Sequence, residues 1–443
     1  MAYVDKLYND YFLEYASYYI KERAIPYIED GLKPVQRRIL HSLHELDDGK
    51  FHKVANVVGN TMKYHPHGDA SINSALVVLA NKDLLIEKQG NFGNIFTGDA
   101  AAAGRYIECR LTKIAHEVLF NKELTEYIDS YDGRNQEPIV FPAKIPILLT
   151  QGAEGIAVGM STRILPHNLT ELLNAEIAYL RDETTQLYPD FPTGGKIDIS
   201  GYQDGNGKVL VRAKLDTNDP KRIIIREIPY GTTTESLISS IEDAVRKNKV
   251  KVSAIQDYTA EQVEIELKLA RGVYSEDVVE TLYAFTECEV SISAQFMLIQ
   301  DNKPRVLSVT EVLQQNVDQL INILTAELRL EKNKLKERLH ARTLEQLFIE
   351  NRIYKVIEEQ TTNEDIHTSI HEGLSPYSDE IGRDVTKEDI ETLLKIPIRR
   401  ISLYDIQRAQ KEMREIRKRL REINKHLKQI IPYAIEFLEG ILE

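Results

Sequence analysis

GDAAAAGRYIECR, residues 98–110, places an arginine directly beside a tyrosine after a run of small residues. Small side chains allow a large polymer to approach the backbone closely. A tyrosine hydroxyl can act as a nucleophile, and an arginine can neutralise charge that develops on a phosphate. The segment therefore predicts that Tyr106 attacks a DNA backbone with Arg105 at its side. A lone tyrosine is more often a packing residue, so the rest of the chain decides between the two interpretations.

The composition is that of an ordinary multidomain protein. The chain has 443 residues, more than one compact core needs, and is 42% hydrophobic and 28% charged. It contains no apolar run as long as a membrane span, and residues 1–6 lack the order of a signal peptide. Cys109 and Cys288 form no disulfide framework and no metal spacing. These features favour a reducing cytoplasm.

The net charge of -13 argues against a uniformly basic DNA-binding domain, but basic clusters occur locally. Lys33, Arg37 and Arg38 lie together, and Pro34 fits the first turn of a helix that begins there. The cluster is either a solvated helix start or a phosphate contact aided by the positive end of the helix. The stretch alone does not decide between these alternatives.

The next segment indicates a helix, a short break and a second helix. Residues 53–62 and 70–80 have helical patterns, and residues 64–69 form a turn between them. This is the shape of a helix-turn-helix, whose second helix can enter a DNA groove. His65 and His67 lie in the break. No further ligand stands at zinc spacing, so hydrogen bonding to a phosphate or leaving oxygen is the better interpretation.

The remaining chain divides into a mixed region and a helical region. Residues 8–28 form an aromatic-rich helix candidate, and residues 150 to about 320 read as a mixed α+β domain. The last third is helical: one long helix passes through residues 321–339, and a second has an a/d seam over residues 406–430 with a basic outer face. The simplest arrangement is an antiparallel helical pair with a globular block, residues 361–404, at its far end.

Four ordered motifs carry a family resemblance: EYASYYIKERAIPYIEDGLKPVQRR from residue 14, KYHPHGD from 63, QGNFGNIFTGDAAAAGRY from 89 and GIAVGMSTRILPHNL from 155. They resemble the A subunit of bacterial type IIA DNA topoisomerases, the gyrase and topoisomerase IV family. The resemblance is strong to about residue 180 and architectural beyond. Two alternatives are a non-catalytic winged-helix DNA-binding scaffold and a helical dimerisation protein unrelated to DNA.

The resemblance implies a multidomain α+β fold with a winged-helix domain, a mixed α/β tower domain, and a long antiparallel coiled coil that ends in a helical dimerisation gate. The expected divisions are an N-terminal arm helix (1–28), the winged-helix DNA-cleavage domain (29–150), the tower (151–320), the coiled coil (321–360 and 405–443) and the C-gate dimerisation domain (361–404).

The resemblance also implies the roles of individual residues. Tyr106 matches the nucleophile that forms a 5′-phosphotyrosyl link, Arg105 the arginine that steadies the phosphate, and His67 a histidine beside the reacting phosphate. Ile164 matches an isoleucine that wedges between base pairs and bends the DNA. The implied backbone contacts are Arg23, Lys33, Arg37, Arg38, Lys53, His65 and Arg110.

The resemblance further implies that this chain carries no metal site of its own. In the family, Mg²⁺ and ATP are bound by the B subunit, and the active form is an A2B2 heterotetramer built on an A-subunit homodimer acting on double-stranded DNA. The expected location is the cytoplasm, in association with the nucleoid, and no membrane partner is expected.

Three departures from the family pattern refine the expectation. Gln36 stands where gyrases commonly carry a histidine, and the contact could survive as a neutral hydrogen bond. Ala70 and Ser74 replace the usual serine and acid of the quinolone-binding helix, so we expect weak stabilisation of cleavage by fluoroquinolones. The sequence ends at Glu443 without a DNA-wrapping domain or a QRRGGRG-like box. Topoisomerase IV-like decatenation and relaxation is therefore favoured over supercoiling, and the alternative is a shortened A subunit of gyrase.

Overall fold

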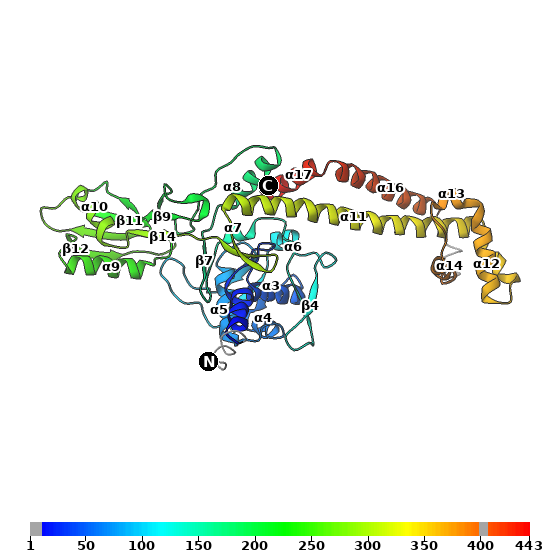
Figure 1. Ribbon diagram of the computed structural model, residues 1–443, viewed down its shortest axis with the longest axis horizontal. Helices are drawn as coiled ribbons and strands as arrows, with labels where there is room; N and C mark the ends of the chain where they lie inside the picture. The colour runs from blue at the N-terminus through cyan, green and yellow to red at the C-terminus, as the bar shows by residue number, and fades with distance from the viewer. Residues whose placement is uncertain (1–10, 398–405) are drawn as a thin grey trace, which may run out of the picture. The chain divides into compact units, whose positions relative to one another are not determined.

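The computed structural model describes residues 11–397 and 406–443. The chain divides into two compact units, one running to Leu320 and including Phe437–Glu443, and the other comprising Ile321–Glu436. The fold is mixed α/β, as expected (Figure 1). The first ten residues of the expected arm helix and residues 398–404 of the expected gate lie outside the described residues, as does residue 405.

Three helices and a small sheet form the N-terminal part of the first unit. The helices are α3 (Pro34–Leu46), α4 (Val54–Thr61) and α5 (Asp69–Ala80), and the antiparallel sheet has the order β1 (His52–Lys53), β3 (Glu108–Leu111), β2 (Ile86–Gln89). Pro34 occupies the first turn of α3, where its missing N–H is not needed. α5 buries Ile72, Leu76 and Leu79 at helical spacing. Each contributes about 1.5–3 kcal/mol by leaving water.

The helix expected over residues 8–28 ends at Ala24, and residues 8–10 lie outside the described residues. Its described part is α2 (Leu13–Tyr19) followed by the π-helical turn η2 (Ile20–Ala24). Ile25 is extended, at φ -104° and ψ 129°, because a residue before proline avoids the helical region. The helix therefore ends at Ala24, two residues before Pro26, and Tyr27 pairs with Ile299 in a β-bridge.

Short elements connect this part to the middle of the chain. They include a hairpin formed by the antiparallel strands β6 and β7. In order they are α6 (Lys113–Leu119), β4 (Tyr127–Asp129), β5 (Gln136–Pro138), α7 (Ile147–Gln151), β6 (Ala153–Ile156), β7 (Ser161–Ile164), α8 (Leu169–Leu180), β8 (Lys196–Asp198) and η3 (Gln203–Gly205).

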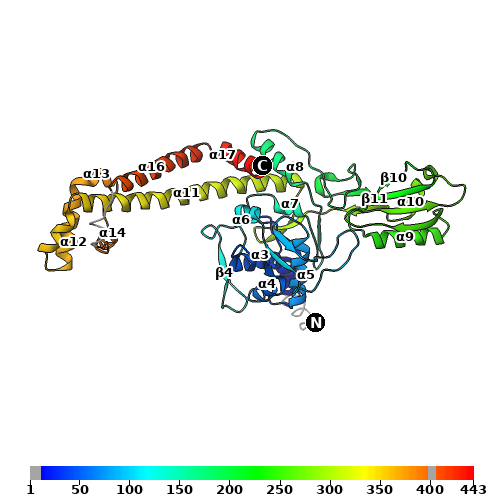
Figure 2. The same cartoon turned by 180° about the vertical axis from the view of Figure 1, so that it is seen from behind.

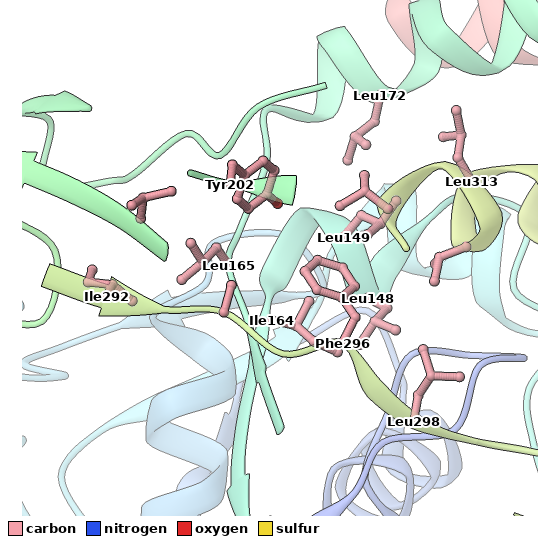
Figure 3. Packing of buried hydrophobic residues seen from close by; sticks show 14 of the residues in the cluster. Leu148, Leu149, Ile164, Leu165, Leu172, Tyr202, Ile292, Phe296, Leu298 and Leu313 are labelled. Carbon is pink, nitrogen blue, oxygen red and sulfur yellow. The ribbon is translucent and has the colours of Figure 1, made fainter. Parts of the chain in front are cut away.

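The middle of the chain contains two antiparallel sheets. One has the order β14 (Glu289–Ser293), β9 (Lys208–Arg212), β8, and the other has the order β10 (Lys214–Asp216), β11 (Arg222–Glu227), β13 (Ile265–Leu269), β12 (Val252–Asp257). Ile223 and Ile225 of β11 are buried on either side of the partly exposed Ile224, and they pack against α9 (Thr234–Arg246) and α10 (Ser275–Phe285). The first sheet shares a separate core with α7, α8 and the start of α11 (Figure 3). The hairpin β15 (Met297–Gln300)–β16 (Lys303–Val306) follows.

The second unit is a helical pair with a small helical block at its end (Figure 2). α11 (Val309–Glu350) enters it, and α16 (Ile406–Lys428) returns. Arg338 pairs with Glu412 and Glu331 with Arg419, so the numbers run in opposite directions and the helices are antiparallel. The block contains η4 (Ile353–Glu359), α12 (Asn363–Leu374), η5 (Ser375–Tyr377), α13 (Ser378–Ile381) and α14 (Lys387–Leu394), packed on the last turns of α11.

The return helix breaks once. α16 ends at Lys428, and α17 (Ile430–Leu442) begins two residues later. Pro432 lies in the first turn of α17 and has no N–H to donate to Lys428, so the helix ladder is interrupted there. No helix within residues 11–397 and 406–443 is long and apolar enough to cross a membrane.

One buried acid in α8 has no partner. Glu176 is completely buried, and neither carboxylate oxygen has a hydrogen-bond partner among the described residues. Burial raises the pKa of Glu176 well above its ordinary value. The folded protein therefore keeps a proton that the unfolded chain releases near pH 4.3. Its contribution to stability falls as the pH rises above that value.

We expect Glu176→Met to raise the melting temperature, because it replaces an unpaired buried carboxyl whose cost is about 1–3 kcal/mol. The gain should be larger at pH 8 than at pH 5, measured by thermal unfolding. Glu171→Gln changes an exposed acid on the same helix and should alter stability by less than about 0.5 kcal/mol. A Met variant no more stable than wild type at pH 8 would contradict this account.

Candidate active site

Tyr106 lies on an exposed turn just before β3. Its side chain is 64% exposed, and its backbone N–H donates to the Ala103 carbonyl at 2.8 Å. The guanidinium carbon of Arg105 lies 4.6 Å from the centre of the Tyr106 ring. The hydroxyl has no hydrogen-bond partner among the described residues. The turn thus presents a phenol and a guanidinium together to the outside, and their roles as nucleophile and charge-neutralising partner stay a prediction.

Two backbone hydrogen bonds fasten this turn to the start of α4. Ala55 N donates to the Gly104 carbonyl and Val54 N donates to the Ile107 carbonyl, both at 3.0 Å. These amides belong to the first turn of α4, where backbone N–H groups have no partner within the helix. Arg105 and Tyr106 are therefore held from both sides beside the positive end of a helix, which favours an anion.

Gly104 allows the turn to approach α5. A Cβ at this position would lie 2.8 Å from Asn73 Oδ1 and 3.3 Å from Ala55 N. Any larger residue would push the turn away from both helices. The small residues before Tyr106 thus serve the packing of the protein itself, in addition to the approach of a polymer.

The glycine-spaced loop before this turn, residues 90–94, is bonded to the segment that leads to Tyr106. Gly93 has φ +83°, and a Cβ there would lie 2.4 Å from the Asp99 carbonyl. Asn94 N donates to that same carbonyl at 3.1 Å, and Ala102 N donates to Asn91 O at 2.9 Å. The glycine therefore allows two backbone segments to cross closely. The N–H groups of Asn94 and Ala102 are bonded within the loop and do not form a phosphate cradle.

His65, His67 and Arg38 come together in front of α5. The two imidazole rings lie edge to face with centroids 4.8 Å apart, and His67 Nε2 lies 3.1 Å from the hydroxyl of Tyr18. Arg38 Nη1 donates to His65 Nδ1 at 3.2 Å. Burial, with the charges of Arg38, His67 and Arg23, lowers the pKa of His65 to about 4. His65 is therefore neutral at pH 7, with Nδ1 as acceptor and Nε2–H as donor.

Arg38 is held in place by Glu137. Its Nε donates to Oε2 at 2.5 Å and its Nη2 to Oε1 at 3.1 Å. The fork geometry fixes the guanidinium plane and leaves Nη1 for His65. Glu137 comes from β5, 99 residues away in the chain. No local pattern in the sequence could have indicated it.

Arg37 lies inside the protein. Its Nε donates to Asp30 Oδ2 at 2.6 Å and its Nη2 to Asp30 Oδ1 at 2.9 Å, and the residue is 4% exposed. Asp30 also accepts N–H groups from Leu32 and Phe141. The contact of Arg37 with DNA stays a prediction, but its Nε and Nη2 atoms are already bonded to Asp30 and to the Leu32 carbonyl.

Lys33 and Gln36 form the start of α3. The Gln36 side-chain oxygen accepts the Lys33 N–H at 2.9 Å and caps the helix. Lys33 Nζ donates to the carbonyl of Glu154 at 2.5 Å, and burial lowers the pKa of Lys33 from its ordinary value. Lys82 lies near Lys33 and donates to the Gln151 carbonyl at 2.5 Å. Lys82 was missed because it joins the cluster only through the fold.

The other expected backbone contacts differ in exposure. Arg23 is exposed, with its guanidinium over the ring of Tyr19 at 4.7 Å. Lys53 pairs with Glu108 at 2.7 Å. Arg110 bridges Glu87 across the β2–β3 pair, at 2.8 and 3.0 Å. These exposed ion pairs are weak, so a phosphate could take either cation from its carboxylate.

Ile164 is buried at the end of β7. It is 2% exposed and packs with Leu148 and Phe296 (Figure 3). The most exposed apolar residue of the same hairpin is Ile156, at 82%. A wedge between base pairs would require Ile164 to leave this core.

Ala70 and Ser74 are both exposed on α5. Ser74 Oγ donates back to the Ala70 carbonyl at 3.0 Å. Within the described residues, no three His, Cys, Asp or Glu side chains meet in an arrangement that could hold a metal ion.

Comparison with known proteins places this site in a family. Residues 23–439 match the family model for the A subunit of DNA gyrase/topoisomerase IV. The chain is 56% identical to the DNA topoisomerase 4 A subunit of Borreliella burgdorferi over 434 residues, which cover 98% of this chain and 69% of that protein. It is 39% identical to the DNA gyrase A subunit of Lawsonia intracellularis and 37% identical to that of Escherichia coli, covering 74% of this chain each time.

The chain belongs to the family of DNA gyrase and topoisomerase IV A subunits. The expected resemblance is therefore confirmed, and the larger identity is with the topoisomerase IV protein. The chain spans 44% and 41% of the length of the two gyrase proteins.

The buried Asp30–Arg37 pair gives a test of stability. We expect Arg37→Gln to lower the free energy of unfolding by about 3–5 kcal/mol, because it leaves the Asp30 carboxylate buried without its cation. Urea unfolding measures this. Arg23→Gln removes an exposed arginine of the same region and should cost less than about 0.5 kcal/mol. Equal effects of the two substitutions would refute the internal role of Arg37.

Proposed function

We propose that this chain is the DNA-cleaving part of a type IIA topoisomerase that, with its B subunit, decatenates and relaxes DNA. The Tyr106 hydroxyl attacks a backbone phosphorus, a 5′-phosphotyrosyl ester forms, and the bond to the 3′ oxygen breaks. The proton lost by the phenol is balanced by the proton gained by the 3′ hydroxyl. The reverse attack reseals the strand, and the ester preserves the energy of the broken bond.

The observation that carries this proposal is the exposed Tyr106 on a turn fastened to α4, with Arg105 over its ring. Arg105 lies beside the phenol, so its charge can stabilise the pentavalent transition state of a phosphate bound at Tyr106. Exposure alone is shared with other tyrosines, such as Tyr131 at 60%, and the adjacent guanidinium distinguishes Tyr106.

The histidine cluster supports the same reaction. We propose that His67 hydrogen-bonds the reacting phosphate and that neutral His65, oriented by Arg38, donates its Nε2–H to the backbone nearby. Arg23, Lys33, Lys53 and Arg110 would neutralise neighbouring phosphates, whose contacts position a duplex without reading its sequence. We assign Arg37 to the protein core, where it supports this surface from beneath.

We propose the finer domain structure on the family pattern. α3, α4 and α5 with the β1–β3–β2 sheet make up a winged-helix domain within 29–150, and the two middle sheets make up a tower within 151–320. Segments 321–360 and 405–443 form the coiled coil, and 361–404 the dimerisation gate. The antiparallel ion pairs between α11 and α16 support the coiled coil.

The partners follow from the family. We propose that two copies of this chain join two B subunits in an A2B2 assembly, and that the B subunit supplies the Mg²⁺ and hydrolyses the ATP. Mg²⁺ would stabilise charge on the phosphate and the leaving oxygen. The residues of this chain supply the nucleophile and the guanidinium, and they hold the DNA.

Tyr106→Phe tests the nucleophile. The variant should bind duplex DNA as the wild type does, since it keeps the ring under Arg105, but should form no covalent complex. The assay mixes the chain, its B subunit, Mg²⁺ and supercoiled plasmid, and then denatures the protein with detergent. Protein-linked cleavage by the Phe variant at the wild-type level would reject Tyr106 as the nucleophile.

Ile164→Ala tests the wedge. If Ile164 leaves the core to enter the duplex, the variant should bend DNA less, measured by energy transfer between the duplex ends. It should also lose about 2–4 kcal/mol of stability. Ile156→Ala removes an exposed apolar side chain of the same hairpin and should change neither quantity. Loss of bending in the Ile156 variant alone would move the wedge to Ile156.

A further inference from the structure

α16 carries a row of cations at regular spacing. Nine basic residues and three carboxylates lie between residues 406 and 428, in a chain whose net charge is -13. Six of the basic residues are separated by steps of three and four along the helix, and all six are exposed. We call these six the basic stripe: Lys411, Arg414, Lys418, Arg421, Lys425 and Lys428.

The basic stripe lies on the side of α16 opposite its partner helix. The seam that faces α11 buries Ala409, Met413, Ile416 and Ile423. In a heptad with Met413 at position a, the stripe occupies the b and f positions, which are furthest from the partner. The stripe therefore takes no part in the apolar packing of the helical pair.

The ion pairs that join the two helices use other residues. Glu412 binds Arg338 and Arg342, and Arg419 binds Glu331. Both Glu412 and Arg419 occupy the g position, beside the seam. Within the described residues, the only carboxylate within 4.0 Å of any stripe cation is Glu422, at 4.0 Å from Lys418. The charges of the stripe are thus available to another molecule.

Pairing and helix stability do not explain the stripe. Like charges three and four residues apart on a helix repel, so the steps from Lys411 to Arg421 disfavour the helix, whereas Lys425 and Lys428 lie in its last turn, where cations are favourable. α11 shows the contrast, because its acids and bases are interspersed. The first four cations of the stripe thus work against the stability of α16, which favours a function in binding an extended anion.

The dimensions of the stripe suit a nucleic acid backbone. Lys411 and Lys428 are 17 residues apart, about 25 Å along a helix that rises 1.5 Å per residue. That length matches about seven base pairs at 3.4 Å each. Between Lys411 and Arg421 an open groove of about 890 Å³ is lined by five basic side chains together with Glu415 and Leu420. Sites that stack unpaired bases use aromatic side chains, and none lines this groove.

We propose that the basic stripe of α16 binds the phosphate backbone of a DNA duplex other than the one cut at Tyr106. This rests on the proposed function, in which one duplex passes through a break in another. The contact is electrostatic and independent of sequence, because lysine and arginine at regular intervals neutralise phosphates without reading bases. The contact is weak enough for release, since salt screens the attraction between exposed cations and phosphates.

Charge removal along the stripe tests the proposal. The variant K411Q/R414Q/K418Q/R421Q of the whole chain should fold, because it relieves repulsion within α16. Duplex binding is followed by fluorescence anisotropy between 50 and 200 mM salt. Four lost phosphate contacts should reduce the slope of log K against log salt by about 3 to 4, so the variant loses about a hundredfold less affinity over that range.

The matched control removes four exposed cations elsewhere, in K247Q/K251Q/K268Q/R271Q, and should keep the wild-type slope. A photo-crosslinking residue at Gln410, beside the stripe, should attach to DNA in the wild-type background and not in the stripe variant. Equal slopes for the stripe and control variants, or crosslinking of Gln410 to the B subunit in place of DNA, would overturn the proposal.

Cleavage separates this proposal from the proposed function. With Mg²⁺ and the B subunit present, the stripe variant should form the covalent complex at the wild-type level, because no stripe residue belongs to the Tyr106 site. If the wild type itself forms no covalent complex, the proposed function fails, while crosslinking at Gln410 still reports whether the stripe binds DNA. Loss of cleavage in the stripe variant would show that it acts on the cut duplex and would overturn the second-duplex assignment.

Discussion

The two hydrogen bonds from the start of α4 to the carbonyls of Gly104 and Ile107 are the constraint on which the candidate site depends. They place a flexible stretch of small residues on a helix end whose N–H groups need acceptors. The bonds flank Arg105 and Tyr106 and so restrain the backbone of both residues, while their side chains remain exposed. A nucleophile that must meet a phosphorus in line gains from this restriction, since orientation is set before the substrate arrives.

A second buried centre supports the surface from below. Asp30 collects two bonds from Arg37 and one N–H each from Leu32 and Phe141, and so ties the start of α3 to the segment after β5. The same region supplies Glu137, which orients Arg38 toward His65. Adjacent arginines thus have different tasks: Arg37 holds the fold, and Arg38 orients the neutral, buried imidazole of His65.

Features that depend on residues close together in the chain could be predicted from the sequence, and features that depend on distant partners could not. The helix patterns over 53–62 and 70–80 reappear as α4 and α5, because periodicity is a local property. The Arg105–Tyr106 pair was visible because its residues are adjacent. Burial of Arg37 and of Ile164 was not, since each depends on partners far away in the chain, and neither Glu137 nor Lys82 carries a local signal.

Charge distribution reconciles an acidic chain with a DNA-binding family. Around Tyr106 most of the cations are paired with a carboxylate, a backbone carbonyl or a ring, so their field is short-ranged and geometric. On α16 the cations of the basic stripe are aligned and mostly unpaired, so their field is extended and sensitive to salt. The first arrangement suits chemistry at one phosphate, and the second suits loose retention of a duplex that has to move on. We expect the acidic remainder of the chain to repel phosphates elsewhere, which would favour DNA binding at these two proposed surfaces.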